Sequence, residues 1–237
     1  MLRLSVTVLA VLSLATLHAN QAGAPSPADL DRIVTRVLEA NSTYVQTFRN
    51  LAAEETKDIQ QFDKSGRVNK QRRIVSDLLV YQPTRTAVRA DHLVDWVGRE
   101  QVDGHEVVVL DYRSKTPKPQ QDFLAHFGAT AVAVRGRLWA DAATFQLQRD
   151  RFEVVALHPN MPEPLLSIRR EATYGESRFG ILTPQRVVAE WFDRTGGTKQ
   201  TPILTRAALL TYTYGAFRRF EVATEETIAA PGSLKDP

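Results

Sequence analysis

Residues 102–113 read VDGHEVVVLDYR, an Asp-Gly pair followed by a run in which apolar residues recur at alternate positions. Asp-Gly between apolar runs is a strong β-hairpin signal, because both residues tolerate the positive φ angles of a tight turn. Beyond the turn, Val108, Leu110 and Tyr112 fall on one face of a strand, since side chains alternate across a strand. The stretch therefore predicts an antiparallel sheet with an apolar face.

The same alternation recurs on both sides of this hairpin. Upstream, residues 62–67 (FDKSGR) predict a second hairpin turn with Gly66 at positive φ, and the strand that follows is expected to stop at Pro83. A turn is expected at residues 141–144. Further strands are expected at residues 132–134, 137–140, 145–155, 167–174, 186–192, 208–214 and 218–224. The chain therefore predicts about nine to eleven antiparallel strands.

Two helices are expected beside this sheet. From Asp29 to Phe48, apolar residues recur at spacings of three and four, as in an amphipathic helix, and Ser26 or Asp29 is available to cap it. A second, short helix is expected within residues 117–127, where Phe123, Leu124 and Phe127 have helical spacing. The sequence thus predicts a mainly β (α+β) fold. A sheet this wide tends to curl, and its concave side becomes either a packed core or a pocket.

The N-terminus has the three parts of a secretory signal peptide. Arg3 precedes an uncharged apolar run over residues 4–17, and a small-residue stretch follows over residues 19–24. Cleavage is expected after Ala19, with Ala22 as the alternative. An uncleaved N-terminal anchor is less favoured, because the apolar run is shorter than the roughly 20 residues of a membrane span. Residues 1–19 are thus expected to be removed and the mature chain to be periplasmic or secreted.

Composition limits the remaining function classes. The chain has no cysteine, which excludes disulfides, thiolate metal sites, cysteine nucleophiles and a lipid-modified cysteine anchor. Its net charge is only +3, and the local basic clusters at residues 70–73 and 218–219 are more typical of solvated strand faces than of a nucleic-acid interface. No nucleic-acid partner is expected. Residues 29–228 are expected to form one soluble domain and residues 229–237 a flexible tail.

No catalytic or metal-binding motif is found. The sequence lacks a GxSxG elbow, an HExxH pair and a phosphate-binding glycine loop. Consecutive histidines of the mature chain lie 13 to 32 residues apart, without metal-ligand spacing. Asp91, His92 and Asp95 would suit an oriented imidazole, but no activated hydroxyl accompanies them, so surface polarity is favoured. The expectation is no catalytic residue, no metal and no cofactor.

Large aromatic residues are spread over at least six of the expected strands. Core packing is the first explanation, and a ligand pocket is the alternative, because both use the same residue types. The candidate pocket residues are those expected to share the concave face: Val108, Leu110, Tyr112, Ile168, Ala172, Tyr174, Tyr212 and Tyr214. A single-residue bulge would invert the facing of any of these strands.

Four stretches, in order, are similar to LolA-like proteins, the periplasmic outer-membrane lipoprotein carriers and their wider superfamily. Residues 102–112 resemble its V-x-G-x-x-v-x-v-L strand pair, and residues 136–149 (GRLWADAATFQLQR) its G-x-l-W-i-D-x-x-t-x-x-i-x-r strand and turn. Residues 182–187 (LTPQRV) resemble its l-P-x-x-v strand entry, and residues 212–222 (YTYGAFRRFEV) its closing Y-x-x-f-k-r-F-x-V strand. Together they span most of the mature chain.

The resemblance implies a single strongly curved antiparallel sheet that forms an incomplete barrel, lidded by the long N-terminal helix and the short inserted helix. It implies a monomeric, non-enzymatic carrier that holds acyl chains of a lipid or acylated lipoprotein, with membrane-associated donor and acceptor proteins as partners. Two alternatives stay open. One is a non-catalytic structural or protein-interaction domain of the same fold with a filled core, and the other is a secreted hydrolase.

Overall fold

The computed structural model describes residues 23–48, 51–79, 92–119, 129–158, 161, 163–198 and 202–219. Within these residues the chain forms one helix and a ten-stranded sheet. The elements in chain order are α1 (Pro27–Phe48), β1 (Leu51–Phe62), β2 (Val68–Leu79), β3 (His92–Val102), β4 (His105–Ser114), β5 (Lys118–Pro119), β6 (Ala131–Asp141), β7 (Leu147–Leu157), β8 (Leu165–Gly175), β9 (Thr183–Gly197) and β10 (Pro202–Arg219). The mainly β fold with one antiparallel sheet is confirmed.

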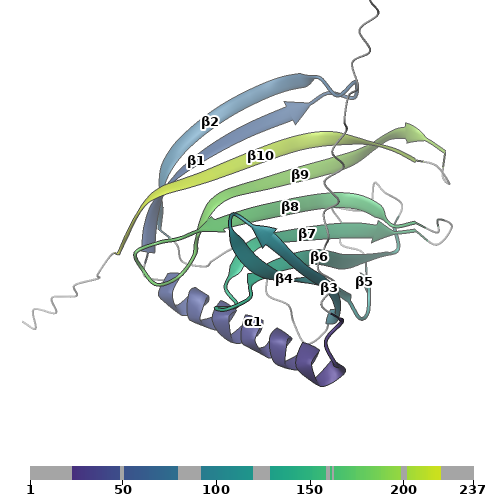
Figure 1. Ribbon diagram of the computed structural model, residues 1–237. Helices are drawn as coiled ribbons and strands as arrows, with labels where there is room; N and C mark the ends of the chain where they lie inside the picture. Colours follow the sequence, from purple (N-terminus) through teal and green to yellow (C-terminus); the bar gives the residue numbers. More distant parts are fainter. Residues whose placement is uncertain are drawn as a thin grey trace, which may run out of the picture.

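The sheet is built around a meander. Strands β6 to β10 are neighbours in both sequence and space, and β10 then pairs with β1, so that the order is β2-β1-β10-β9-β8-β7-β6-β4-β3 (Figure 1). The short β5 pairs with β6. Every pairing is antiparallel. The two edge strands, β2 and β3, come from the two hairpins that precede the meander in the sequence.

The expected strong curvature is not found. The sheet is open and not strongly curled, because its edge strands β2 and β3 do not pair with each other in the described part of the chain. Large side chains from the sheet and from α1 fill the space on one face. The structure is therefore an open sheet with a helix on one face, and not the expected incomplete barrel.

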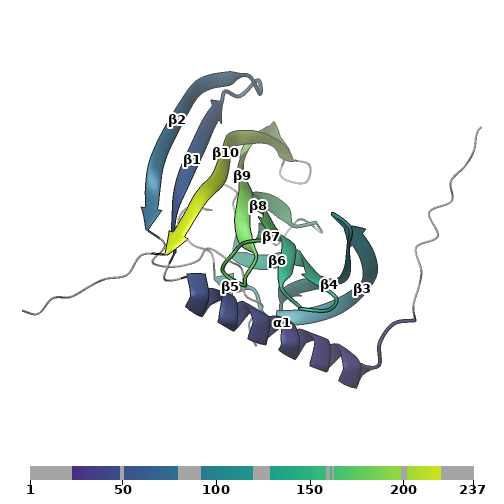
Figure 2. The same ribbon diagram turned by 60° about the vertical axis from the view of Figure 1, so that its left-hand side comes forward.

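The helix begins at Pro27, two residues before the expected Asp29. Ser26 caps it: the Ser26 hydroxyl accepts a hydrogen bond from the Asp29 backbone N–H (3.2 Å) and donates one to the Asp29 carboxylate (2.7 Å). The helix ends at Phe48, as expected from the apolar spacing. It lies across one end of the strands (Figures 1 and 2).

Two of the hairpin turns have the predicted backbone. Asp103 and Gly104 have φ angles of 48° and 84°, and Gly66 has a φ angle of 79°. The expected strand start at Phe145 is wrong, however. Asp141 accepts hydrogen bonds from the backbone N–H groups of Ala143 (3.0 Å) and Thr144 (2.7 Å), which extends the turn. Phe145 has a φ angle of 60°, and β7 begins only at Leu147.

The main core lies between α1 and the adjacent end of the sheet. Tyr44 stacks on Phe48 with a centroid distance of 5.0 Å and meets Tyr174 of β8 edge to face at 6.2 Å. Phe48 also packs on Phe217 of β10 at 6.0 Å. This face of the sheet, on which α1 packs, is called the inner face below. The opposite face is called the outer face.

Several expectations fall outside the described residues. They are the signal peptide over residues 1–19, the greater part of the inserted helix and the tail over residues 229–237. Of the segment expected to hold the inserted helix, Lys118 and Pro119 form β5. Among the described residues, no helix is both long and apolar enough to cross a membrane.

Candidate functional site: the inner face

The eight predicted pocket residues share the inner face. Leu110 of β4 lies opposite Leu138 of β6, and the same row continues through Asp150, Ala172 and Val187 to Tyr212 of β10. Because side chains alternate along each strand, the remaining predicted residues also point to this face. That they line a ligand cavity stays a prediction.

The eight residues differ in what covers them. Five of them are buried in the core cluster beneath α1, namely Val108, Leu110, Tyr112, Ala172 and Tyr174. Tyr212 and Tyr214 are partly buried and pack against this cluster. Ile168, which is half-buried, belongs to none of the three buried clusters. Most of the predicted residues therefore belong to the core against which the helix packs.

A second group of apolar side chains lies on the inner face beyond the helix-covered core. Ile168 of β8 lies opposite Trp191 of β9, and Leu210 of β10 lies opposite Ile59 of β1. All four are half-buried, and none belongs to a core cluster. We call Ile59, Ile168, Trp191 and Leu210 the distal patch.

Smaller apolar residues join the members of the distal patch across the sheet. Ala208 lies opposite Trp191, and Ala189 lies opposite Leu210. The patch therefore spans β8, β9, β10 and β1 without interruption. Sequence reasoning found only Ile168 of its four members. The signal for Trp191 and Leu210 was the alternation within residues 186–192 and 208–214, while Ile59 lies in a strand that the sequence did not clearly indicate.

One polar group interrupts the inner face between the core and the distal patch. Arg170 forms an ion pair with Asp150 at 2.9 Å, and the Tyr174 hydroxyl donates a hydrogen bond to the second carboxylate oxygen at 2.5 Å. Asp150 is fully buried. Burial lowers the pKa of Arg170, but Asp150, together with Tyr174 and Tyr112, raises it by more. The pKa is therefore higher than that of a free guanidinium, and Arg170 stays charged. Both carboxylate oxygens of Asp150 are therefore paired within the apolar face.

A tyrosine at the border of the core is held in its neutral form. Burial is the main cause that raises the pKa of Tyr214 above its usual value, and the adjacent carboxylate of Glu55, to which the phenol is hydrogen-bonded, raises it further. The neighbouring Tyr212 ring lies 5.0 Å from the Lys57 ammonium. Tyr214 therefore acts as a hydrogen-bond donor on this face and not as a base.

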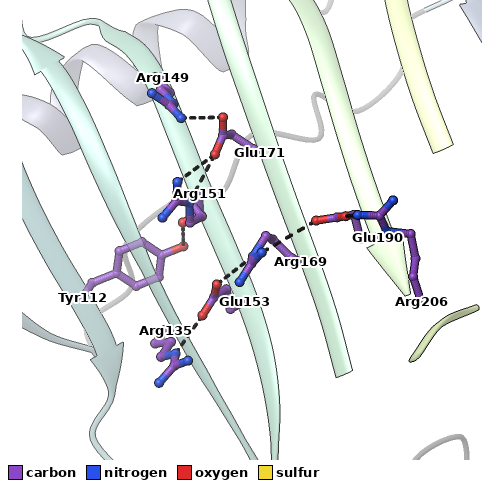
Figure 3. Close-up of polar contacts among 9 residues, drawn as sticks. All are labelled: Tyr112, Arg135, Arg149, Arg151, Glu153, Arg169, Glu171, Glu190 and Arg206. Atoms are coloured by element: carbon purple, nitrogen blue, oxygen red, sulfur yellow. Dashed lines mark hydrogen bonds and ion pairs between the residues drawn. The ribbon is translucent and has the colours of Figure 1, made fainter. Parts of the chain in front are cut away.

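The outer face carries a chain of ion pairs that runs across five strands (Figure 3). It is formed in strand order by Arg135, Glu153, Arg169, Glu190 and Arg206, with N···O distances of 2.8, 2.9, 3.8 and 2.8 Å. We call these five residues the ion-pair ladder. It links β6 to β10 in the direction perpendicular to the strands, and sequence reasoning did not find it.

A second polar group lies beside the ladder. Glu171 of β8 binds both Arg149 (2.6 Å) and Arg151 (3.0 Å) of β7 (Figure 3). The guanidinium of Arg149 also lies 4.8 Å from the ring of Trp139, whose indole N–H donates to Glu100 at 3.0 Å. These contacts pair Glu171 with two arginines of the neighbouring strand.

Removing Glu153, one of the two acids of the ladder, is expected to destabilise the sheet in a pH-dependent way. Burial raises the pKa of Glu153, but hydrogen bonds from Arg135 and Arg169 lower it more, so its pKa lies below the ordinary 4.5. A lowered pKa contributes stability above the unfolded-state value, which is lost as the pH falls through the folded-state value. Glu153→Gln is therefore expected to lower the free energy of unfolding by about 1 kcal/mol at pH 7.

Urea denaturation of this variant and the wild type at pH 7 and below pH 4 checks the prediction. The difference between them is expected to shrink at the lower pH. Glu106→Gln is the matched control, because Glu106 pairs with Arg99 at 2.9 Å but lies in solvent. An equal loss in both variants, or a loss that does not depend on pH, would contradict the role of the ladder.

In the described residues, no three potential metal ligands come together. His92 lies edge to face with Tyr112 at a centroid distance of 5.4 Å. His105, at the start of β4, lies 3.5 Å from the carboxylate of Asp141, at the end of β6. Asp91 and His126 lie outside the described residues.

Comparison with known proteins gives one likeness of fold. No protein-family model and no curated protein matches the chain. The structure is similar to that of a DUF1329 family protein from Desulfovibrio piger ATCC 29098, with a TM-score of 0.40 and 11% sequence identity. The match covers 80% of this chain and 92% of that one. None of these comparisons confirms the resemblance to LolA-like proteins, which stays a prediction.

Proposed function

We propose that this protein is an exported carrier that binds the acyl chain of a lipid or a lipoprotein on the inner face of its sheet. It acts without catalysis and without a cofactor, and it exchanges its ligand with membrane-associated donor and acceptor proteins. The observation that carries the proposal is the distal patch. Its four large apolar side chains lie side by side on four strands and are only half-buried.

The size of the patch suits an alkyl chain. Neighbouring strands lie roughly 4.8 Å apart, so four adjacent strands span about 14 Å, which is the length of roughly eleven to twelve methylene groups. Each methylene removed from water contributes about 0.8 kcal/mol. Burying eight of them would give about 6 kcal/mol, which corresponds to a dissociation constant in the range of tens of micromolar.

The position of the helix fits the same function. α1 closes the core next to the patch through contacts of Tyr44 and Phe48 with β8 and β10. An acyl chain on the distal patch would lie beyond the Asp150–Arg170 pair, on the part of the inner face outside the helix-covered core. Uptake and release of the chain would then leave the helix-covered core intact.

Trp191 offers a direct test, because it is a fluorescent member of the patch. Stearate carrying bromine atoms in its chain quenches tryptophan on contact. We expect 9,10-dibromostearate to quench the fluorescence of the wild type in a saturable way, and we expect Trp191→Phe to abolish most of this quenching. Trp139→Phe is the matched control, because Trp139 lies on the outer face.

The quenching experiment also separates the proposal from its rival. A protein-interaction domain with a filled core would not bind the brominated chain, and no saturable quenching would be seen. Quenching that persists in Trp191→Phe and disappears in Trp139→Phe would place the chain on the outer face. Either result contradicts the proposal.

A further inference from the structure

Three basic residues lie on the inner face at the β1–β2 edge of the sheet. Lys57 of β1 lies opposite Ile74, and Arg72 and Lys70 of β2 lie opposite Ile59 and Gln61. Lys57 places its ammonium over the Tyr212 ring, which fixes this row of residues to the inner face. We call Lys57, Lys70 and Arg72 the basic corner.

The basic corner is not neutralised by the described part of the chain. No carboxylate there lies within ion-pair distance of any of its three side chains. On the same hairpin, Asp58 pairs instead with Arg73 on the outer face at 3.7 Å. Glu55, the nearest acid along the inner row of β1, is hydrogen-bonded to Tyr214. Both Lys70 and Arg72 are exposed to solvent.

The basic corner adjoins the distal patch. Ile59, a member of the patch, is directly opposite Arg72 and is two residues from Lys57 on the same strand. Directly opposite residues have Cβ atoms about 5 Å apart, and alternate residues on one strand are about 7 Å apart. An apolar surface four strands wide therefore ends in a cluster of positive charge.

We infer that the basic corner binds the anionic headgroup, a carboxylate or a phosphate, of a lipid whose acyl chain lies on the distal patch. The inference rests on the proposed function and adds the class of ligand. Basic residues on an edge strand also protect it from pairing with other strands. Protection of the edge does not depend on which face of β2 carries the charge, so Arg73 on the outer face would serve it equally well. Headgroup binding, in contrast, requires the basic residues of the inner face. Variants on the two faces of β2 therefore distinguish the two roles.

The test compares two ligands that differ only in the headgroup. A neutral apolar fluorophore, N-phenyl-1-naphthylamine, is bound to the full chain and then displaced by dodecanoate or by dodecanol. The test variant is Lys70→Gln/Arg72→Gln. The control variant is Lys64→Gln/Arg73→Gln, which removes one lysine and one arginine from the same hairpin without changing the basic corner.

We expect the test variant to need about tenfold more dodecanoate than the wild type, because a solvent-exposed ion pair with the carboxylate is lost at each position. Its response to dodecanol is expected to stay within twofold, and the control variant is expected to behave as the wild type with both ligands. A similar change for both ligands, or equal changes in both variants, would overturn the inference while leaving the carrier function standing. Failure of both ligands to displace the probe from the wild type would overturn the proposed function, and the inference with it.

A free anion is distinguished by a separate titration. Inorganic phosphate alone, measured by calorimetry, is expected to bind more weakly than about 1 mM, because the chain supplies most of the affinity. Saturable micromolar binding of phosphate that is lost in Lys70→Gln/Arg72→Gln would assign the corner to a free anion, and this would contradict the inference.

Discussion

Replacing Gly136 by alanine is expected to lower the free energy of unfolding by about 3 kcal/mol or more. A Cβ atom at this position would lie 2.1 Å from the backbone oxygen of Arg151 on β7 and 2.4 Å from the hydroxyl of Tyr112 on β4. The carbonyl cannot move without breaking the β6–β7 ladder, and the Tyr112 ring is buried in the core. Chemical denaturation at neutral pH measures the loss.

Gly215→Ala is the control for this experiment. Gly215 is also a strand glycine, on β10, but a Cβ atom there would have no neighbour within 4 Å. This variant is expected to change the free energy of unfolding by less than about 1 kcal/mol. If Gly136→Ala were as stable as Gly215→Ala, the close approach of Tyr112 to β6 would be wrong.

Replacing Asp150 by alanine is expected to cost about 3–5 kcal/mol of stability. The change leaves the guanidinium of Arg170, whose side chain is only 17% exposed, without its carboxylate partner on the inner face. It also removes the acceptor of the Tyr174 hydroxyl. Thermal and chemical unfolding of the purified variant measure the effect.

Two further variants separate burial from charge. Asp95→Ala removes the carboxylate partner of Arg113 from a pair with side chains that are 60% and 55% exposed, and it is expected to cost less than about 1 kcal/mol. The double variant Asp150→Leu/Arg170→Met replaces both buried charges by apolar groups and is expected to recover most of the loss. A double variant less stable than Asp150→Ala would show that the pair stabilises the sheet by more than mutual neutralisation.

The parts of the fold that the sequence predicted are those that local chemistry decides. Asp103 and Gly104 form the expected turn because few residues tolerate their backbone angles. Ser26 caps α1 as expected, since its hydroxyl replaces a missing backbone partner. Phe145 was misassigned to a strand because the hydrogen bonds of Asp141, which extend the turn, are not visible in an alternating pattern.

The parts that the sequence did not predict depend on contacts between distant segments. The pairing of β1 with β10 joins residues 51–61 to residues 208–219, and no local pattern indicates it. The ion-pair ladder likewise needs the register of five strands before Glu153 can be placed between Arg135 and Arg169. The curvature was overestimated because the sequence shows only the number of strands, which determines the tendency of a sheet to curl. The degree of curvature also depends on the side chains that fill the inner face, and these are known only from the structure.

The same limit applies to the candidate site. Alternation along each strand was enough to place Val108 and Tyr174 on a common face, because the direction of a side chain in a strand depends only on its position in that strand. It was not enough to tell which residues on this face lie under α1 and which lie beyond it. The half-buried members of the distal patch, Trp191 and Leu210 among them, emerge only when the position of the helix is known.

Native mass spectrometry of the protein purified from the cells that produce it, followed by organic extraction, tests the carrier function most directly. Discrete mass additions that correspond to lipids or acyl chains are expected, and the extract is expected to contain the same species. The additions are expected to be lost when Leu210, at the centre of the patch, is replaced by aspartate. A protein that carries no extractable lipid, and that binds none when lipids are supplied, would contradict the carrier function.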